Sequence, residues 1–383
     1  MNAVPQGNSA QRPGLTPAQQ SLHPSAAELG LWPRAGQAER ACADAPAGYA
    51  QCLALVRTDI QGLIAPDTPA GYSPADLQTA YDLTKYSSSK GSGETVAVVD
   101  AYDDPDAAAD LAIYRRAYGL RPCTSANHCY TKKAFTLQGN SSWGEEESVD
   151  LDMVSAICPN CKLLLVEAAN NSIGSLASAE KYATAHADYV SNSWSGDEGS
   201  RAYDGDFNVS GVAITAATGD VGYNKTAQWP AILPTVTAVG GTTLSSFKPR
   251  EESAWSRAGS GCSHVYAKPS FQHDLNTGCS DRAEADTSAD ADPNTGVGVY
   301  DTDGESGWLV FGGTSVAAPI IASVFALGGN RANNNDTHLY GHKSSLHDIT
   351  SGENGTCGKP LCEAGPGWDG PTGLGTPNGI TAF

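Results

Sequence analysis

The segment Thr95-Val-Ala-Val-Val99 gives the most direct indication of the fold. It is a continuous run rich in β-branched residues, with Gly91 and Gly93 before it and an acidic stretch, residues 100–106, after it. A strand buried on both faces of a parallel sheet has such a run instead of a strict alternation of apolar and polar residues. We therefore predict a buried parallel strand here, followed by a helix over residues 106–118.

Strands and helices are predicted to alternate along the rest of the chain. A helix should begin at Ser73-Pro74, with the serine as its cap. Gly240-Gly241 should end a strand, and the Gly-, Ser- and Asp-rich residues 248–306 should form long surface loops. The other predicted helices cover residues 145–157, 175–186 and 315–327, and the other strands cover residues 162–167, 189–194, 212–217, 236–239 and 308–311. This order predicts an α/β fold with a doubly wound, mostly parallel sheet flanked by helices. Such a sheet places its active site at the carboxyl ends of its strands.

Composition and charge exclude several classes of function. The chain has 383 residues, of which 40% are hydrophobic and 17% charged, so it can bury a sizeable core. Its 23 basic and 42 acidic residues give a net charge of −19. Nucleic acids and anionic membranes both require a basic surface, so we expect neither as a partner. No apolar run approaches the roughly 18 residues of a membrane span.

The ten cysteines fall into five pairs of near neighbours along the chain. These are Cys42/Cys52, Cys123/Cys129, Cys158/Cys161, Cys262/Cys279 and Cys357/Cys362. An even and local pattern of this kind suggests five short-loop disulfides and an oxidising compartment. The alternative for Cys158/Cys161, half of a zinc site or a redox pair, lacks a second cysteine or histidine pair at zinc spacing.

The N-terminal part of the chain differs in amino-acid composition from the rest. We expect residues 1–72 to be a flexible leader with a small cysteine-paired segment, and residues 73–383 to form the main domain. The start of the chain lacks a basic stretch followed by an apolar one. We therefore expect that a signal peptide has been removed or that the chain is not the full precursor.

A serine lies where a predicted strand gives way to a predicted helix, in Gly312-Gly-Thr-Ser315-Val-Ala-Ala-Pro319. Backbone amides and the dipole at a helix N-terminus favour developing negative charge near such a hydroxyl. An ordinary helix-capping serine is the commoner reason for such a residue.

The predicted helix over residues 145–157 is acidic and lies within the segment Trp143–Pro159. Glu146 and Asp150 are spaced i,i+4 and share a helix face, so one carboxylate can hold a proton on the other. Glu145 has Val149 at i+4 and offers no such pair. The alternative is that these carboxylates form an acidic, solvated helix face. Glu147 and Asp152 are assigned either to such a face or to the surroundings of the pair.

A third segment, Thr218-Gly-Asp220-Val-Gly222, follows the predicted strand 212–217. An isolated Asp-x-Gly is most often a turn. A carboxyl group can stabilise an oxyanion only when it is protonated, because only then can it donate a hydrogen bond.

Together these segments resemble the sedolisins, the serine-carboxyl peptidases with a subtilisin-like fold. The motif Gly-Thr-Ser-x-x-x-Pro is similar to the nucleophile segment of the subtilisin clan, yet none of the eight histidines is followed by Gly as that clan's base requires. The sedolisin helix pattern is Glu-x-x-Leu-Asp with Pro nine residues later. Glu146, Asp150 and Pro159 match it, with Val149 in the place of the usual Leu. The resemblance implies that Ser315 is the nucleophile, Glu146 the general base, Asp150 its partner and Asp220 the oxyanion donor.

The same resemblance implies two further sites. Ser193, Trp194 and Ser195 match a substrate-lining edge. Asp348, Ile349, Gly365, Gly367 and Asp369 match a calcium site, and their carboxylate and carbonyl oxygens suit Ca²⁺.

The sequence therefore predicts a secreted, extracellular, acid-acting serine-carboxyl endopeptidase that is monomeric and cleaves proteins or peptides. Family members are generally made with a folded prodomain, for which residues 1–72 look too short. Two alternatives remain open: a neutral subtilisin-like serine peptidase that uses Asp100, and a calcium-stabilised, non-catalytic binding protein on a peptidase scaffold.

Overall fold

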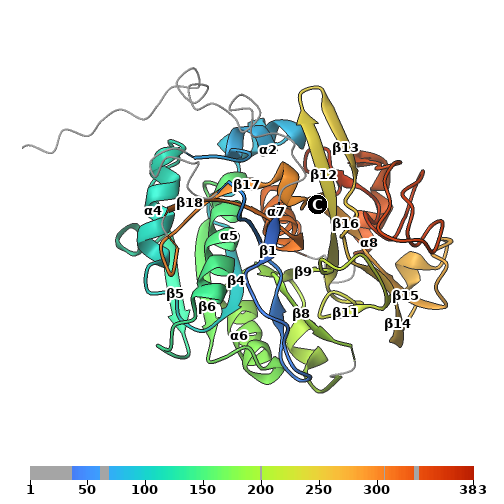
Figure 1. Cartoon of the computed structure of the whole chain (residues 1–383), viewed down its shortest axis with the longest axis horizontal. Coiled ribbons are helices and arrows are strands. Elements are labelled where there is room, and N and C mark those ends of the chain that lie inside the picture. Colours follow the sequence, from blue (N-terminus) through green and yellow to red (C-terminus); the bar gives the residue numbers. More distant parts are fainter. Residues whose placement is uncertain (1–36, 61–68, 199–200, 306, 332–335) are drawn as a thin grey trace, which may run out of the picture.

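A computed structural model describes residues 37–60, 69–198, 201–305, 307–331 and 336–383. Its centre is a sheet with the strand order β13-β12-β9-β7-β4-β6-β5, in which β16 also pairs with β12 (Figure 1). All neighbours in this sheet are parallel except β12 and β13. The strands are β4 (Thr95–Ala101), β5 (Tyr130–Ala134), β6 (Lys162–Ala168), β7 (Tyr189–Asn192), β9 (Ala213–Ala217), β12 (Thr237–Phe247), β13 (Arg250–Ala254) and β16 (Thr287–Asp290).

Helices cover both faces of this sheet. Along β4, Val96 and Val98 pack in the same core cluster as α5 and α7, whereas Ala97 and Val99 pack in the cluster that contains α6. Burial on both faces explains why the sequence of β4 shows no alternation. The helices are α2 (Pro74–Ala80), α3 (Thr84–Ser89), α4 (Ala107–Ala117), α5 (Ser141–Ile157), α6 (Ile173–His186), α7 (Thr314–Gly328) and α8 (Thr337–Gly341). The predicted α/β class is confirmed.

Shorter strands surround the main sheet. They are β1 (Ala38–Arg40), β2 (Gln51–Cys52), β3 (Leu55–Arg57), β8 (Trp194–Asp197), β10 (Tyr223–Thr226), β11 (Gln228–Trp229), β14 (Ser260–Ala267), β15 (Asp281–Glu284), β17 (Val297–Asp301), β18 (Gly307–Gly312), β19 (Leu346–His347) and β20 (Thr376–Pro377). The predicted cap at Ser73 is present, because its side chain accepts a hydrogen bond from the amide of Asp76. The five predicted disulfides are all formed.

Four local predictions were wrong. Gly240 and Gly241 do not end a strand, since β12 continues through them to Phe247. A Cβ on Gly240 would lie 2.3 Å from the carbonyl oxygen of Pro371, so the glycine permits a close approach of two backbones. The predicted strand 189–194 is divided at Ser193 into β7 and β8. Residues 248–306 are not surface loops, because they contain β13 to β17 and many of their small polar side chains are buried.

The fourth error concerns the predicted strand 308–311. It is β18, which lies outside the parallel sheet and pairs antiparallel with β17 and β3. The partner β3 belongs to the N-terminal segment, whose β2 also pairs with β8. Residues 37–57, drawn in blue in Figure 1, are therefore bound to the body of the fold by strand pairing. The predicted leader, up to residue 36, lies outside the described residues, and the boundary at residue 72 stays a prediction.

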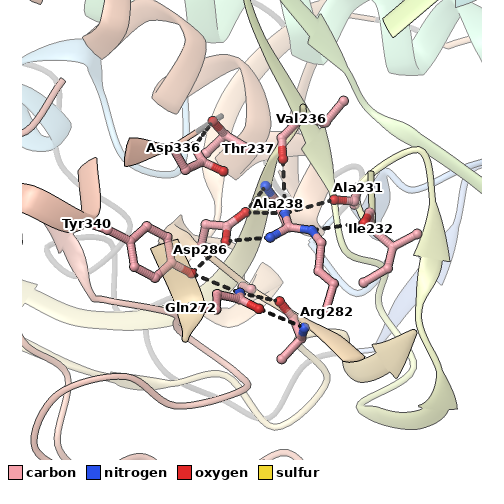
Figure 2. Close-up of polar contacts among 12 residues, drawn as sticks. Ala231, Ile232, Val236, Thr237, Ala238, Gln272, Arg282, Asp286, Asp336 and Tyr340 are labelled. Carbon is pink, nitrogen blue, oxygen red and sulfur yellow. Dashed lines mark hydrogen bonds and ion pairs between the residues drawn. The ribbon is translucent and has the colours of Figure 1, made fainter. Parts of the chain in front are cut away.

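A buried ion pair fastens the part of the fold beside β15 and β16. Arg282 and Asp286 are both fully buried, and Arg282 Nη2 lies 2.6 Å from Asp286 Oδ2. The guanidinium group also donates to the carbonyl oxygens of Ile232 and Val236, at 2.9 and 3.0 Å. Asp286 in turn accepts a hydrogen bond from the hydroxyl of Tyr340 at 2.7 Å. Figure 2 shows how one cation thus links β15, the segment before β12 and α8.

Candidate active site

The candidate nucleophile begins the most buried helix of the fold. β18 ends at Gly312, Gly313 has φ +99°, and α7 starts at Thr314, so the chain turns sharply just before Ser315. Ser315 is fully buried, and its hydroxyl donates to the carbonyl oxygen of Ser193 at 3.2 Å. This position lies next to the point where β7 ends, at the carboxyl edge of the parallel sheet.

Glu146 and Asp150 lie on α5, the helix that packs against α7. Ser193 connects the aspartate to the serine segment, because its hydroxyl donates to Asp150 Oδ1 at 2.6 Å and lies 3.3 Å from the carbonyl oxygen of Ser315. The interpretation of this helix as a solvated acidic face was wrong. Glu147 and Asp152, which the sequence assigned to that face or to the surroundings of the pair, are as buried as the pair itself.

The carboxyl groups of Glu146 and Asp150 on α5 interact electrostatically with that of Asp100, near the end of β4. Burial raises the pKa of Glu146 well above its usual value, and the charge of Asp100 raises it further. Burial and then the charge of Asp100 also raise the pKa of Asp150, and the charge of Glu146 raises it further. Neither oxygen of Asp100 has a hydrogen-bond partner among the described residues. A buried group of like charges retains protons, so part of this cluster is neutral near neutral pH.

The alternative of a neutral subtilisin-like peptidase would use Asp100 as the partner of a histidine. In the structure Asp100 lies in a cluster of carboxyl groups. Within the part of the chain that the structure describes, no histidine is hydrogen-bonded to Asp100 or to Ser315.

Asp220 presents one free oxygen toward the turn before Ser315. Its Oδ1 accepts hydrogen bonds from the amide and the hydroxyl of Thr314, both at 2.8 Å. Its Oδ2 is buried and has no partner among the described residues. A Cβ on Gly313 would lie 2.9 Å from Oδ2, so this oxygen faces the glycine. Burial raises the pKa of Asp220 to about 6, which leaves the group protonated and able to donate in acid.

All three residues of the predicted substrate edge are buried, and of the three only Ser195 lines a pocket. Trp194 is fully buried, and its indole N–H donates to the carbonyl oxygen of Val99 at 2.9 Å, so this side chain belongs to the core. Ser195 lines a small pocket beside Asp220, together with residues 51–53. The amides of Leu53 and Ala54 donate to Glu146 Oε2 at 2.8 and 2.7 Å. The contacts of residues 51–54 with this site have no signal in the local sequence, because they arise only when distant strands pair.

The five residues of the predicted calcium site come together around one loop. Asp348 accepts a hydrogen bond from the amide of Gly367 at 3.0 Å, and Asp369 accepts one from the amide of Gly365 at 3.2 Å. Ile349 is buried beside them. Burial and, to a lesser extent, the charge of Asp348 raise the pKa of Asp369 to about 7, against opposing hydrogen bonds. Two carboxyl groups that repel each other suit a hard cation such as Ca²⁺, which prefers oxygen ligands. In the described residues no group of three or more His, Cys, Asp or Glu side chains is placed to hold a metal ion.

The chain is similar to a set of known peptidases. The family model Peptidase S8, the subtilase family, matches residues 135–347, which is more than half of the chain. Kumamolisin from Bacillus sp. (strain MN-32) is 31% identical over 358 residues, which cover 82% of this chain and 63% of kumamolisin. Sedolisin from Pseudomonas sp. (strain 101) is 28% identical over 373 residues, covering 82% of this chain and 61% of sedolisin. The chain thus spans less than two thirds of the length of these relatives.

The comparison with solved structures identifies the fold. Pseudomonas sedolisin, a serine-carboxyl proteinase complexed with two molecules of pseudo-iodotyrostatin, matches with a TM-score of 0.69 at 24% identity. The match covers 81% of this chain and 96% of that chain. The fold is therefore the subtilisin-like α/β fold, with a serine and carboxyl groups at its candidate site. The chain belongs to the subtilase family and, by its similarity to kumamolisin and sedolisin, to the sedolisins within it.

Proposed function

We propose that the chain is a secreted, acid-acting serine-carboxyl endopeptidase that cleaves proteins or peptides as a monomer. The observation that carries this proposal is the pairing of two features at one sheet edge. Ser315 lies beside Glu146 and Asp150 in a dry cluster, and Asp220 holds one buried oxygen free next to Gly313. All ten cysteines are in disulfides, which supports export to an oxidising compartment. None of the described helices is long and apolar enough to cross a membrane.

In this mechanism the hydroxyl of Ser315 attacks the carbonyl carbon of the scissile peptide bond. Glu146 takes the hydroxyl proton through Oε1, which has no partner among the described residues, and later passes it to the leaving amine. Asp150 orients Glu146 and stabilises its charge during proton transfer, in the role that the aspartate has for histidine in other serine peptidases. Protonated Asp220 and the amide of Ser315 donate to the oxyanion. Water then hydrolyses the acyl-enzyme ester.

Calcium is proposed to bind at Asp348 and Asp369, with carbonyl oxygens of Ile349, Gly365 and Gly367 as further ligands. Bound there, it would neutralise the repulsion between the two carboxyl groups and hold the C-terminal loop against Ala254 and Ala364, which pack with Ile349.

The test is cleavage of an unfolded protein at pH 3 to 5, followed by mass spectrometry of the products. We expect Ser315→Ala and Glu146→Gln to lose activity by at least about a thousandfold, because removal of a nucleophile or base disables the whole unit. The matched control is Glu147→Gln, which removes a buried carboxyl group from the same helix and should keep most of the activity. Near-wild-type cleavage by Ser315→Ala would exclude the proposal.

A further inference from the structure

A pair of histidines lies at the surface of the fold, on the short helix α8. His338 is half-buried, and His342, which caps the C-terminal end of the helix, is exposed. The backbone amide of His342 donates to the carbonyl oxygen of His338 at 3.0 Å, so the two residues lie one helical turn apart. Their imidazole rings are in contact, with centroids 4.0 Å apart. The two rings are thus side by side before any ligand binds.

Each ring is also fixed by a hydrogen bond to a backbone carbonyl group. His338 Nε2 lies 3.2 Å from the carbonyl oxygen of Thr381, and His342 Nδ1 lies 2.9 Å from that of His338. A carbonyl oxygen can only accept, so in the neutral ring the bonded nitrogen carries the hydrogen. The other nitrogens, Nδ1 of His338 and Nε2 of His342, then each have a free lone pair.

These two features together are typical of histidines that bind a transition metal. Residues at i and i+4 lie on one face of a helix, and two histidines at this spacing supply the ligands of helical zinc sites. Metal-binding histidines almost always donate their second N–H to a carbonyl or carboxylate group, which fixes the ring and makes it more basic. Both histidines of α8 meet the two conditions.

Another histidine of the chain provides a comparison that has only one imidazole. On α6, His186 Nδ1 lies 2.7 Å from the carbonyl oxygen of Tyr182, and the two rings stack with centroids 4.0 Å apart. The arrangement is similar to that on α8, but the residue at i−4 is a tyrosine, whose ring carries no nitrogen. This turn therefore offers one metal ligand where α8 offers two.

We propose that His338 and His342 form a binding site for a divalent transition metal such as Zn²⁺ or Cu²⁺, separate from the proposed calcium site. Imidazole nitrogen suits these metals, whereas Ca²⁺ takes oxygen ligands. Since the described residues place no group of three or more His, Cys, Asp or Glu side chains around a metal, water completes the coordination. This site does not depend on the proposed peptidase function.

A metal bound to this pair fastens α8, which is only five residues long. The helix contains Tyr340, whose hydroxyl donates to Asp286 in the buried network of Arg282 (Figure 2). The bond from His338 to Thr381 connects the same helix to the last residues of the chain. Because a ligand that binds only the native state stabilises that state by mass action, the metal should raise the Tm.

The experiment titrates the full chain with Zn²⁺ at pH 7.5, because the metal binds neutral imidazole. The ring signals of carbon-13-labelled histidine are followed by NMR. We expect the signals of His338 and His342 to shift together, with a single dissociation constant. His338→Gln and His342→Gln assign the two signals. Each variant should weaken Zn²⁺ binding by at least about tenfold, because a second imidazole held nearby acts at a high effective concentration. His186→Gln is the matched control and should leave the affinity of the pair unchanged.

Two NMR results would overturn the inference. One is that millimolar Zn²⁺ shifts neither signal of the pair. The other is that His338→Gln leaves the affinity at His342 unchanged, since the two rings would then bind as ordinary single histidines.

Thermal unfolding at pH 7.5 tests the same site by its effect on stability. Zn²⁺ should raise the Tm of the wild type and of Asp369→Asn, which lacks a carboxylate of the proposed calcium site, but not the Tm of His342→Gln. A rise that is lost in Asp369→Asn and kept in His342→Gln would place the Zn²⁺ at the proposed calcium site and refute binding by the histidine pair.

Discussion

Substitution of Asp220 by asparagine should move the alkaline limit of activity upward. Asp220 Oδ1 is held by two hydrogen bonds from Thr314, and only its Oδ2 is free. In Asp220→Asn, the amide oxygen must take the place of Oδ1 because both groups of Thr314 donate. The NH₂ group then occupies the place of Oδ2 beside Gly313. The variant therefore presents a donor at the same point at every pH.

The size of the effect follows from the pKa of Asp220, which burial raises to about 6. At pH 4 roughly 99% of the carboxyl groups are protonated, at pH 7 roughly one tenth, and at pH 8 roughly one hundredth. Since only the protonated form donates, the contribution of Asp220 is complete well below pH 6 and is lost as the pH rises through 6. Loss of one oxyanion donor costs about 10²–10³ in rate. The wild type should thus lose about a hundredfold in activity by pH 8 through this group alone.

The assay is kcat/KM on a fluorogenic peptide from pH 3 to pH 8. Asp220→Asn should retain part of the acid activity and lose less of it above pH 6 than the wild type. Asp220→Ala is the matched control, which should be about 10²–10³ less active than the wild type in acid. A wild-type optimum at or above pH 7, or identical profiles for the wild type and Asp220→Asn, would show that Asp220 is only a turn residue.

The remaining predictions concern stability. Chelation of calcium should lower the Tm, because a ligand bound only by the native state stabilises that state by mass action. Asp369→Asn should make the Tm insensitive to the chelator. An unchanged Tm after chelation, together with no metal by elemental analysis, would refute the calcium site. Arg282→Ala should lower the free energy of unfolding by about 3–5 kcal/mol in denaturant titration, because it leaves Asp286 charged and buried without its cation (Figure 2). A loss below about 1 kcal/mol would show that the ion pair is dispensable.

The sequence was sufficient for five strands of the main sheet, β4, β6, β7, β9 and the start of β12, because these strands carry their own signal, whereas β5, β13 and β16 were not predicted. β4 is rich in β-branched residues from Thr95 to Val99, and it is buried on both sides: Val96 and Val98 face one layer of helices while Ala97 and Val99 face the other. The candidate site residues could be proposed from the sequence for a related reason. Ser315 lies at a strand-to-helix turn, and Glu146 and Asp150 share a helix face. Each of these positions therefore belongs to a short motif that can be recognised in the sequence.

Other features could not be predicted because they depend on distant contacts. Gly240 resembles a strand end in isolation, and only the approach of Pro371 explains it. The small polar residues of 248–306 read as loops, yet Ser288 and Asp290 are buried within β16. The strand pairing of residues 51–57 was the largest omission. Gln51 and Cys52 form a strand of two residues, too short for any periodicity, and its pairing with β8 joins segments far apart in the chain.

The short loops that the five disulfides close determine what each bond can add to stability. Their paired cysteines are 3 to 17 residues apart in the sequence. In the chain-entropy model a short loop gains less from a cross-link than a long one, because the unfolded chain already keeps its two ends near each other. These bonds therefore stiffen individual loops, and the contacts between distant segments depend on strand pairing and core packing. Reduction of one disulfide should thus loosen its own loop and leave the order of strands in the main sheet unchanged.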